Sequence, residues 1–144
     1  MTKTYQALVE DRIFVGGAAD VKDMITEAHC DMIVDLREEA TEPAYTDGNV
    51  TWIHIPIGDN SEIPQEEQFD KAIMQVVTAY RNDQKVGFHC GGGKGRTGAV
   101  AIGTLIELGK ARSIEEAEEL AKSIRPVIHI RPPQREALEK LFEK

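Results

Sequence analysis

The chain has 144 residues, of which 41% are hydrophobic and 29% charged, and its formal net charge is −8. This composition is typical of a soluble globular protein, and the length fits a single domain, 1–144, with a sizeable core. The acidic balance disfavours nucleic acid and anionic membranes as partners. No apolar run approaches the roughly 20 residues that span a bilayer, and the N-terminus lacks a signal-peptide core. We therefore expect a cytoplasmic protein without a membrane-inserted segment.

The first half of the chain alternates short apolar runs with helical patterns. The runs have the length of strands and fall at residues 12–15, 32–36 and 50–55. Gly16-Gly17 is predicted to end the first strand, and Pro56 to halt the third. Asp20 can cap a short helix that runs through about Ala28.

The second half is predicted to be mainly helical. A long helix opens at Pro64, whose position suits the first turn, and it places on one face Phe69, Ile73, Val76, Val77 and Tyr80. A strand at 85–89 precedes a helix at 97–108, which is apolar on most sides and therefore expected to be buried. The remaining signals are Gly109 as a helix end, a Ser113–Glu116 capping box for a helix at 114–124, and a last helix from Pro132-Pro133.

Strands that alternate with helices predict an α/β fold with a central, mostly parallel sheet flanked by helices. In such sheets ligands bind at the carboxyl ends of the strands, and helix N-termini bind phosphate. The loop between the strand at 85–89 and the buried helix is therefore the predicted ligand site.

That loop has the sequence His-Cys-Gly-Gly-Gly-Lys-Gly-Arg-Thr over residues 89–97. Its glycines allow several backbone N–H groups to point at one centre, and Arg96 adds a planar guanidinium that binds two phosphate oxygens. Cys90 would lie beside the phosphorus, ionised by the amides, the helix N-terminus and Arg96. The predicted phosphate-binding residues are Gly91, Gly92, Gly93, Lys94, Gly95 and Arg96. The competing interpretation is a glycine-rich turn around an inert buried cysteine.

The run His-Cys-x5-Arg-Thr resembles the signature of the cysteine-dependent protein tyrosine phosphatase superfamily. Order and spacing from about Arg12 to Phe142 resemble its small dual-specificity branch. The resemblance implies a phosphocysteine intermediate and no metal or cofactor. It also implies that His89 holds the backbone of the nucleophile and is not the base. The matches at Arg125 and Gln134 are softer and are compatible with simple packing.

A thiolate that attacks a phosphate ester needs an acid to protonate the leaving oxygen. Asp59 is the candidate, because it lies on the polar loop after the strand at 50–55. Its spacing from Cys90 resembles that of the general acid in the dual-specificity branch. The alternative is an aspartate that only caps a turn. Asp47 is a weaker rival, and Asp70 is expected on a solvated helix face.

Other polar residues have more modest expected roles. The hydroxyl of Thr97 either donates to the sulfur of Cys90 or belongs to an ordinary helix start, and the sequence leaves both open. Asp35 and Arg37 resemble a recurring structural segment of these phosphatases, which implies an internal ion pair or hydrogen-bond network. Cys30 is interpreted as a core thiol, with a disulfide to an oxidised Cys90 as the alternative.

No metal site is predicted, because the histidines at 29, 54 and 129 show no metal-ligand spacing. The predicted function is hydrolysis of phosphate monoesters on proteins, with phosphotyrosine and also phosphoserine and phosphothreonine as substrates of a shallow pocket.

Lys94 leaves a phosphoinositide or an inositol phosphate open as an alternative substrate, since Lys-Gly-Arg-Thr-Gly is similar to the lipid-phosphatase branch. Gly91, where that branch usually has a second lysine, and the net charge of −8 argue against a membrane substrate. The alternative of another class is an inactive module that binds phosphoproteins, but Cys90, Arg96 and Asp59 are all present. The sequence indicates neither the physiological substrate nor the oligomeric state.

Overall fold

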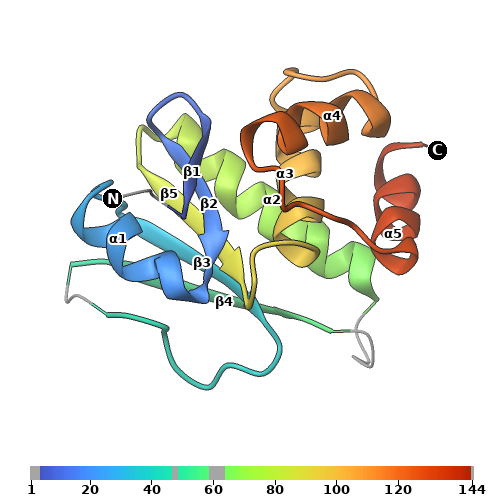
Figure 1. Cartoon of the computed structure of the whole chain (residues 1–144). Helices are drawn as coiled ribbons and strands as arrows, with labels where there is room; N and C mark the ends of the chain where they lie inside the picture. The colour runs from blue at the N-terminus through green and yellow to red at the C-terminus, as the bar shows by residue number, and fades with distance from the viewer. Residues whose placement is uncertain (1–3, 47–48, 59–63, 144) are drawn as a thin grey trace.

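The computed structural model describes residues 4–46, 49–58 and 64–143, which form one twisted sheet with helices on both faces (Figure 1). The sheet has five strands in the spatial order β1 (Gln6–Val9), β2 (Ile13–Gly17), β5 (Val86–Cys90), β3 (Met32–Arg37) and β4 (Thr51–Ile57). Only the β1–β2 pair is antiparallel. The predicted α/β class with a mostly parallel sheet is therefore confirmed.

The two faces of the sheet are covered unequally. The helix α1 (Val21–Thr26), which follows the short 3₁₀ helix η1 (Ala18–Asp20), packs on one face. The other face carries α2 (Gln65–Arg81), α3 (Arg96–Glu107), α4 (Ile114–Ile124) and α5 (Pro132–Phe142) (Figure 1). No helix in the described part of the chain is long and apolar enough to cross a membrane.

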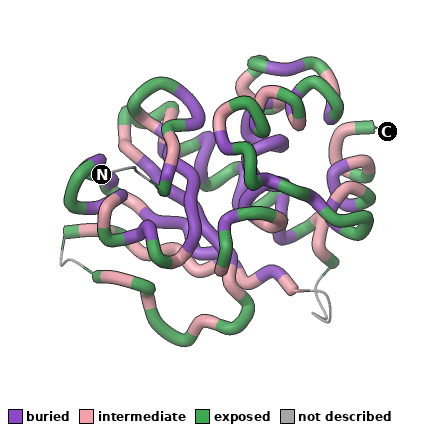
Figure 2. The backbone as a smooth tube through the Cα atoms, in the orientation of Figure 1, coloured by how far each residue is buried: buried purple, intermediate pink, exposed green. Residues whose placement is uncertain are grey.

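Strand side chains alternate between these two cores, as the pleat of a strand requires. Phe14 and Ile33 pack with the residues of α1, whereas Ile13 and Val34 pack on the larger side. The prediction of a buried central helix is confirmed, because every residue of α3 from 97 to 105 is buried (Figure 2). Burial of α3 fixes its N-terminus, and with it the end of the glycine loop.

Several predicted boundaries need correction. Gly16 and Gly17 do not end this strand but belong to it, as the last two residues of β2. Pro56 lies inside β4, which is tolerated because β4 is an edge strand. Pro64 takes the N-cap position of α2 and not its first turn. The short strand β1 was not predicted at all.

The prediction that the Asp20 side chain caps the helix α1 is wrong. No hydrogen bond from the Asp20 side chain caps α1. The carboxylate instead accepts from the Gly17 N–H at 2.8 Å and from the Thr4 hydroxyl. The predicted cap at Ser113 is confirmed, since its hydroxyl accepts from the N–H of Glu116 at 3.1 Å. Gly109, with a φ of 75°, ends α3 as predicted.

Candidate active site

Strand β5 lies in the middle of the sheet and ends at Cys90, from which the loop 91–95 leads to the N-terminus of α3. Strand β2 pairs in parallel with β5 along its whole length, so that Gly17 lies beside Cys90. Ligand-binding groups gather at the carboxyl ends of parallel strands, and the first turn of a helix has unpaired N–H groups. The fold thus puts this loop where an anion is bound.

Glycine is required at two places where β2 meets the loop. Gly93 has a φ of 72°, and a Cβ there would lie 2.6 Å from the backbone of Gly16. A Cβ on Gly17 would lie 2.9 Å from the carbonyl oxygen of Gly91. That carbonyl accepts a hydrogen bond from the N–H of Ala18 at 2.9 Å. Gly17 in β2 and Gly93 in the loop therefore allow the strand and the loop to lie close together.

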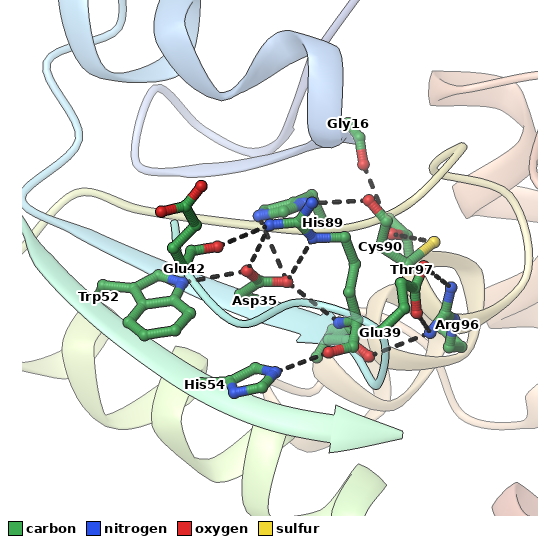
Figure 3. A network of polar contacts seen from close by, with 12 residues as sticks. Gly16, Asp35, Glu39, Glu42, Trp52, His54, His89, Cys90, Arg96 and Thr97 are labelled. Carbon is green, nitrogen blue, oxygen red and sulfur yellow. Dashed lines mark hydrogen bonds and ion pairs between the residues drawn. The ribbon is translucent and has the colours of Figure 1, made fainter. Parts of the chain in front are cut away.

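Cys90 lies under the loop with 4% of its surface exposed (Figure 3). Burial is the largest influence on its thiol and by itself raises the pKa. The Thr97 hydroxyl, the N–H groups of Thr97 and Gly93, and the charge of Arg96 act against burial. The net result is a pKa below that of an ordinary thiol. The thiolate, which is the nucleophilic form, is therefore favoured in the folded protein.

Thr97 is fully buried in the first turn of α3, and its hydroxyl lies 3.1 Å from the Cys90 sulfur. The carbonyl oxygen of Gly16 is a second acceptor at 3.4 Å. A hydroxyl has one proton to donate, and a thiolate is the more strongly charged acceptor. Of the two roles that the sequence left open, the structure supports the hydrogen bond to sulfur.

The guanidinium of Arg96 is held by the ends of β3 and β4 and by Glu39. Its Nη1 donates to the carbonyl oxygens of Ile57 at 3.0 Å and Leu36 at 3.4 Å. Glu39 accepts from both terminal nitrogens, at 3.1 Å and 3.3 Å. The bonds from Arg96 are the main cause of a lowered pKa for Glu39, so this carboxylate is ionised. This bidentate pair fixes the plane of the guanidinium.

Glu39 was not among the predicted site residues. It lies two positions after the end of β3, whose carboxyl end lies at the same edge of the sheet as that of β5. The rule that ligand-binding groups gather at this edge could have identified it.

His89 supports Cys90 through its backbone. Its ring is fully buried, and Nδ1 lies 2.9 Å from the carbonyl oxygen of Cys90. Because a carbonyl only accepts, Nδ1 carries the proton. Burial is the main cause of a lowered pKa for His89, which favours the neutral ring. Nε2 then faces Asp35 at 3.7 Å without a hydrogen bond.

Asp35 is the centre of the predicted polar network. Its carboxylate accepts from the backbone and side chain of Arg37 at 2.9 to 3.0 Å, and from the indole N–H of Trp52 at 3.0 Å (Figure 3). Burial raises the pKa of Asp35, but the bonds from Arg37 and the other neighbours outweigh it and lower the pKa. The expected ion pair between Asp35 and Arg37 is confirmed.

The two softer matches both touch the loop. Arg125, which is 6% exposed, donates from Nε to the carbonyl oxygen of Gly93 at 2.9 Å. It also donates to the carbonyl of Thr4 at 2.5 Å and to the Gln6 side chain at 2.7 Å. Gln134 is 2% exposed and lies so close to the loop that a Cβ on Gly95 would meet its amide at 2.8 Å. Both residues therefore shape the loop as well as the packing.

A cavity of about 300 Å³ opens above the sulfur. It is lined by Cys90, Gly92, Lys94, Gly95, Arg96, His129, Arg131 and Gln134. A smaller cavity of about 200 Å³ shares Arg96, Arg131 and Gln134 with it and is otherwise lined by Glu38, Glu39, Ile57, Gly58 and Gln65. The predicted nucleophile and arginine thus open onto a space that a substrate can enter.

The candidate acid is not placed by the structure. Asp59 and its rival Asp47 both lie outside the described residues. Asp70 is exposed on α2, as expected.

Cys30 does not reach Cys90. Met32 pairs with Val86 in parallel register, so Cys30 lies before the start of β3 while Cys90 lies at the far end of β5. At about 3.3 Å per residue, the two cysteines are roughly 20 Å apart along the sheet. A disulfide needs Cα atoms within about 7 Å. The core interpretation of Cys30 is confirmed, since it is 3% exposed and packs with the residues of α1.

Comparison with known protein families decides the identity of this site. The family described as "Polymorphic toxin system, DSP-PTPase phosphatase" matches residues 2–110. The chain belongs to this family. It is a cysteine-dependent dual-specificity phosphatase, which confirms the resemblance seen in the sequence and removes the support for an inactive binding module. No curated protein matches the chain.

Several solved structures share its fold. Human DUSP28 is 19% identical over 99% of this chain and 95% of its own, with a TM-score of 0.82. PTPMT1 is 21% identical over 96% and 94%, with a TM-score of 0.79. Tk-PTP in its active form is 24% identical over 100% and 99%, also with a TM-score of 0.79. At these identities the likeness establishes the fold and leaves the substrate open.

Proposed function

We propose that this phosphatase hydrolyses phosphate monoesters on proteins in two displacements carried by Cys90, Arg96 and Asp59. The observation that supports this most is the lowered pKa of a cysteine that opens onto a cavity beside an arginine. A thiolate there can attack phosphorus in line, because the guanidinium and the loop amides orient the three non-bridging oxygens.

In the first step the Cys90 sulfur forms a bond to phosphorus, and the bond from phosphorus to the ester oxygen breaks. The departing oxygen takes a proton from Asp59, which leaves Asp59 ionised. In the second step Asp59 takes a proton from water, the resulting hydroxide forms a bond to phosphorus, and the S–P bond breaks. Inorganic phosphate is released, and the Cys90 thiolate and the protonated form of Asp59 are restored.

Arg96 and the amides of residues 91–96 supply positive charge where the transition state concentrates negative charge. Thr97 assists the second step in particular. Its hydroxyl lies 3.1 Å from the sulfur, and a hydrogen bond there stabilises the thiolate as it leaves phosphorus. His89 and Glu39 act indirectly, the first on the backbone of Cys90 and the second on the plane of Arg96.

A phosphorylated inositol is the second candidate substrate. Lys94 lines the cavity above Cys90, and PTPMT1 has been crystallised in complex with PI(5)P.

We also propose that the protein is located in the cytoplasm, as its sequence predicts.

A substrate panel combined with trapping tests this function. Phosphate release is measured from phosphotyrosine, phosphoserine and phosphothreonine peptides, phosphoinositides and inositol phosphates. The reaction of the best substrate is then quenched in acid, and the peptide that contains Cys90 is examined by mass spectrometry. We expect release from the phosphopeptides and a phosphoryl group on Cys90. A phosphoryl group on another residue, or turnover without any covalent intermediate, would contradict the mechanism.

A further inference from the structure

One wall of the cavity above Cys90 is basic. Lys94 comes from the loop, while His129 and Arg131 come from the segment 125–131, which connects α4 to α5. None of the aspartates and glutamates that the structure describes lines this cavity, although the chain carries a net charge of −8. A local excess of positive charge on an acidic protein marks a place where an anion is bound.

The connecting segment is tied to the loop, so its charges stand at a fixed distance from Cys90. The N–H of His129 donates to the carbonyl oxygen of Lys94 at 3.1 Å. At the start of the segment, Arg125 donates to the carbonyl of Gly93. At its end, the N–H of Arg131 donates to the buried side chain of Gln134 at 2.8 Å. The three bonds make the basic wall a preorganised part of the site.

The charge of this wall is distinct from that of Arg96. Arg96 already has Glu39 as a bidentate partner, whereas Lys94 and His129 form no ion pair with the described carboxylates. The cavity volume of about 300 Å³ is at the lower end of the range for small-molecule sites, about 300–1,000 Å³. There is therefore room for a second charged group beside the phosphate that Cys90 attacks.

We propose that Lys94, His129 and Arg131 form a second anion subsite, which selects phosphate monoesters that carry another phosphate on the same small polyol. This rests on the proposed chemistry of Cys90 and on the second candidate substrate, a phosphorylated inositol, whose chemical class it narrows. His129 and Arg131 lie beyond residues 2–110, the part of the chain that the family matches. The required chemistry is a vicinal bisphosphate, either free in solution or in a lipid headgroup.

The test compares kcat/KM for an inositol monophosphate with that for a vicinal inositol bisphosphate. The bisphosphate is expected to be the better substrate, and the ratio should fall with added salt because exposed charges are screened. In the double variant His129→Gln/Arg131→Gln the ratio should fall by about tenfold, since each exposed ion pair contributes modestly. Lys110→Gln removes an exposed charge outside the cavity and should leave the ratio unchanged. Equal kcat/KM for the two compounds, or a ratio that the double variant leaves intact, would overturn the subsite.

The source of the bisphosphate is distinguished by a parallel assay with phosphatidylinositol bisphosphate in phosphatidylcholine vesicles. A lower kcat/KM in vesicles than in solution, with the same dependence on His129 and Arg131, identifies a free metabolite. A higher value identifies a lipid headgroup.

Failure of the subsite is separable from failure of the proposed function, because phosphopeptides report on the latter alone. If nothing is hydrolysed, calorimetry on Cys90→Ser still decides: the bisphosphate should bind at least about tenfold tighter than inorganic phosphate.

Discussion

Cys90 and Cys30 are buried to a similar extent, with 4% and 3% of their surfaces exposed. The pKa values of their thiols are nevertheless shifted in opposite directions. The pKa of Cys30 is raised to about 12, mainly by burial, and the charge of Lys85 acts against this rise. Burial also acts most strongly on Cys90, but the neighbours of Cys90 outweigh it and lower the pKa. Burial alone therefore makes a cysteine inert, and reactivity depends on what surrounds it.

The surroundings differ because of the fold. Cys30 lies before the start of β3 and packs among apolar residues of the smaller core, including Met24 and Ile33. Cys90 lies at the carboxyl end of β5, where the N-terminus of α3 directs the hydroxyl and N–H of Thr97 at the sulfur. The same side chain is thus a packing element at one end of the sheet and the proposed nucleophile at the other.

The largest expected effect comes from replacing the two cysteines one at a time. Cys90→Ser should reduce turnover of aryl phosphates by at least about 10⁴-fold, because the variant lacks a thiolate to form the covalent intermediate. It should still bind phosphate or vanadate through the loop and Arg96. Cys30→Ala is the matched control and should retain kcat within about twofold. Turnover of Cys90→Ser within tenfold of the parent would remove it as nucleophile.

Asp59→Asn should have the next largest effect, but only on some substrates. Loss of a positioned general acid slows the reaction by about 10²–10⁴-fold when the leaving group is an alkoxide. The turnover of phosphoserine peptides should therefore fall far more than that of an aryl phosphate with an acidic phenol. The basic limb of the pH–rate profile should also disappear. Equal slowing of all substrates, with an unchanged profile, would show that Asp59 only shapes its loop. Asp47→Asn is then the variant to examine.

Arg96→Lys should lower kcat/KM by about 10²–10³-fold, because a point charge does not replace a bidentate guanidinium. The substitution also breaks the paired contact with Glu39. Inhibition by vanadate should weaken in parallel with the rate. Near-normal affinity and rate in this variant would exclude Arg96 from phosphate binding.

The part of the site that the sequence revealed is the part built by neighbours along the chain. Cys90, Arg96 and Thr97 lie within one strand–loop–helix unit, so their spacing alone indicated their relation. Glu39 and Arg125 approach the loop from distant segments, and their local sequence does not show which atoms of the loop they contact. Contacts of that kind depend on the packing of whole elements and become visible only in the structure.

The glycines of β2 show the same limit in the fold. Glycine weakens a strand in isolation, and the pair at 16 and 17 was therefore read as its end. The close approach of the Gly91 carbonyl requires glycine at position 17, whereas a Cβ at position 16 would lie 2.7 Å from Met24 and 2.8 Å from Asp20. Pro56 was likewise predicted to halt the strand and instead lies inside it. Only the order of strands in the sheet reveals that β4 is an edge strand, where proline is tolerated. The long helices were predicted well because their periodicity is local.

Thr97→Val should have the smallest of these effects on turnover at neutral pH, and the clearest effect on the pH profile. The variant loses the hydroxyl 3.1 Å from the sulfur while keeping the N–H groups. A hydrogen bond to a charged group contributes about 1.5–3 kcal/mol, which corresponds to about one to two units of pKa. The acidic limb of the profile should therefore move to higher pH by that amount. An unmoved limb would mean that the hydroxyl serves the Gly16 carbonyl instead.

The contrast between the two cysteines is tested most directly by alkylation of both in the same native molecule. The protein is treated with iodoacetamide over a range of pH, and mass spectrometry follows the labelling of each cysteine peptide separately. The rate at Cys90 should rise with pH and reach a plateau with a midpoint below about 8.5, the value of a free thiol, while Cys30 stays unlabelled until the protein is unfolded. A midpoint for Cys90 at or above that value, or labelling of Cys30 at a comparable rate, would contradict the conclusion that its neighbours make Cys90 a thiolate.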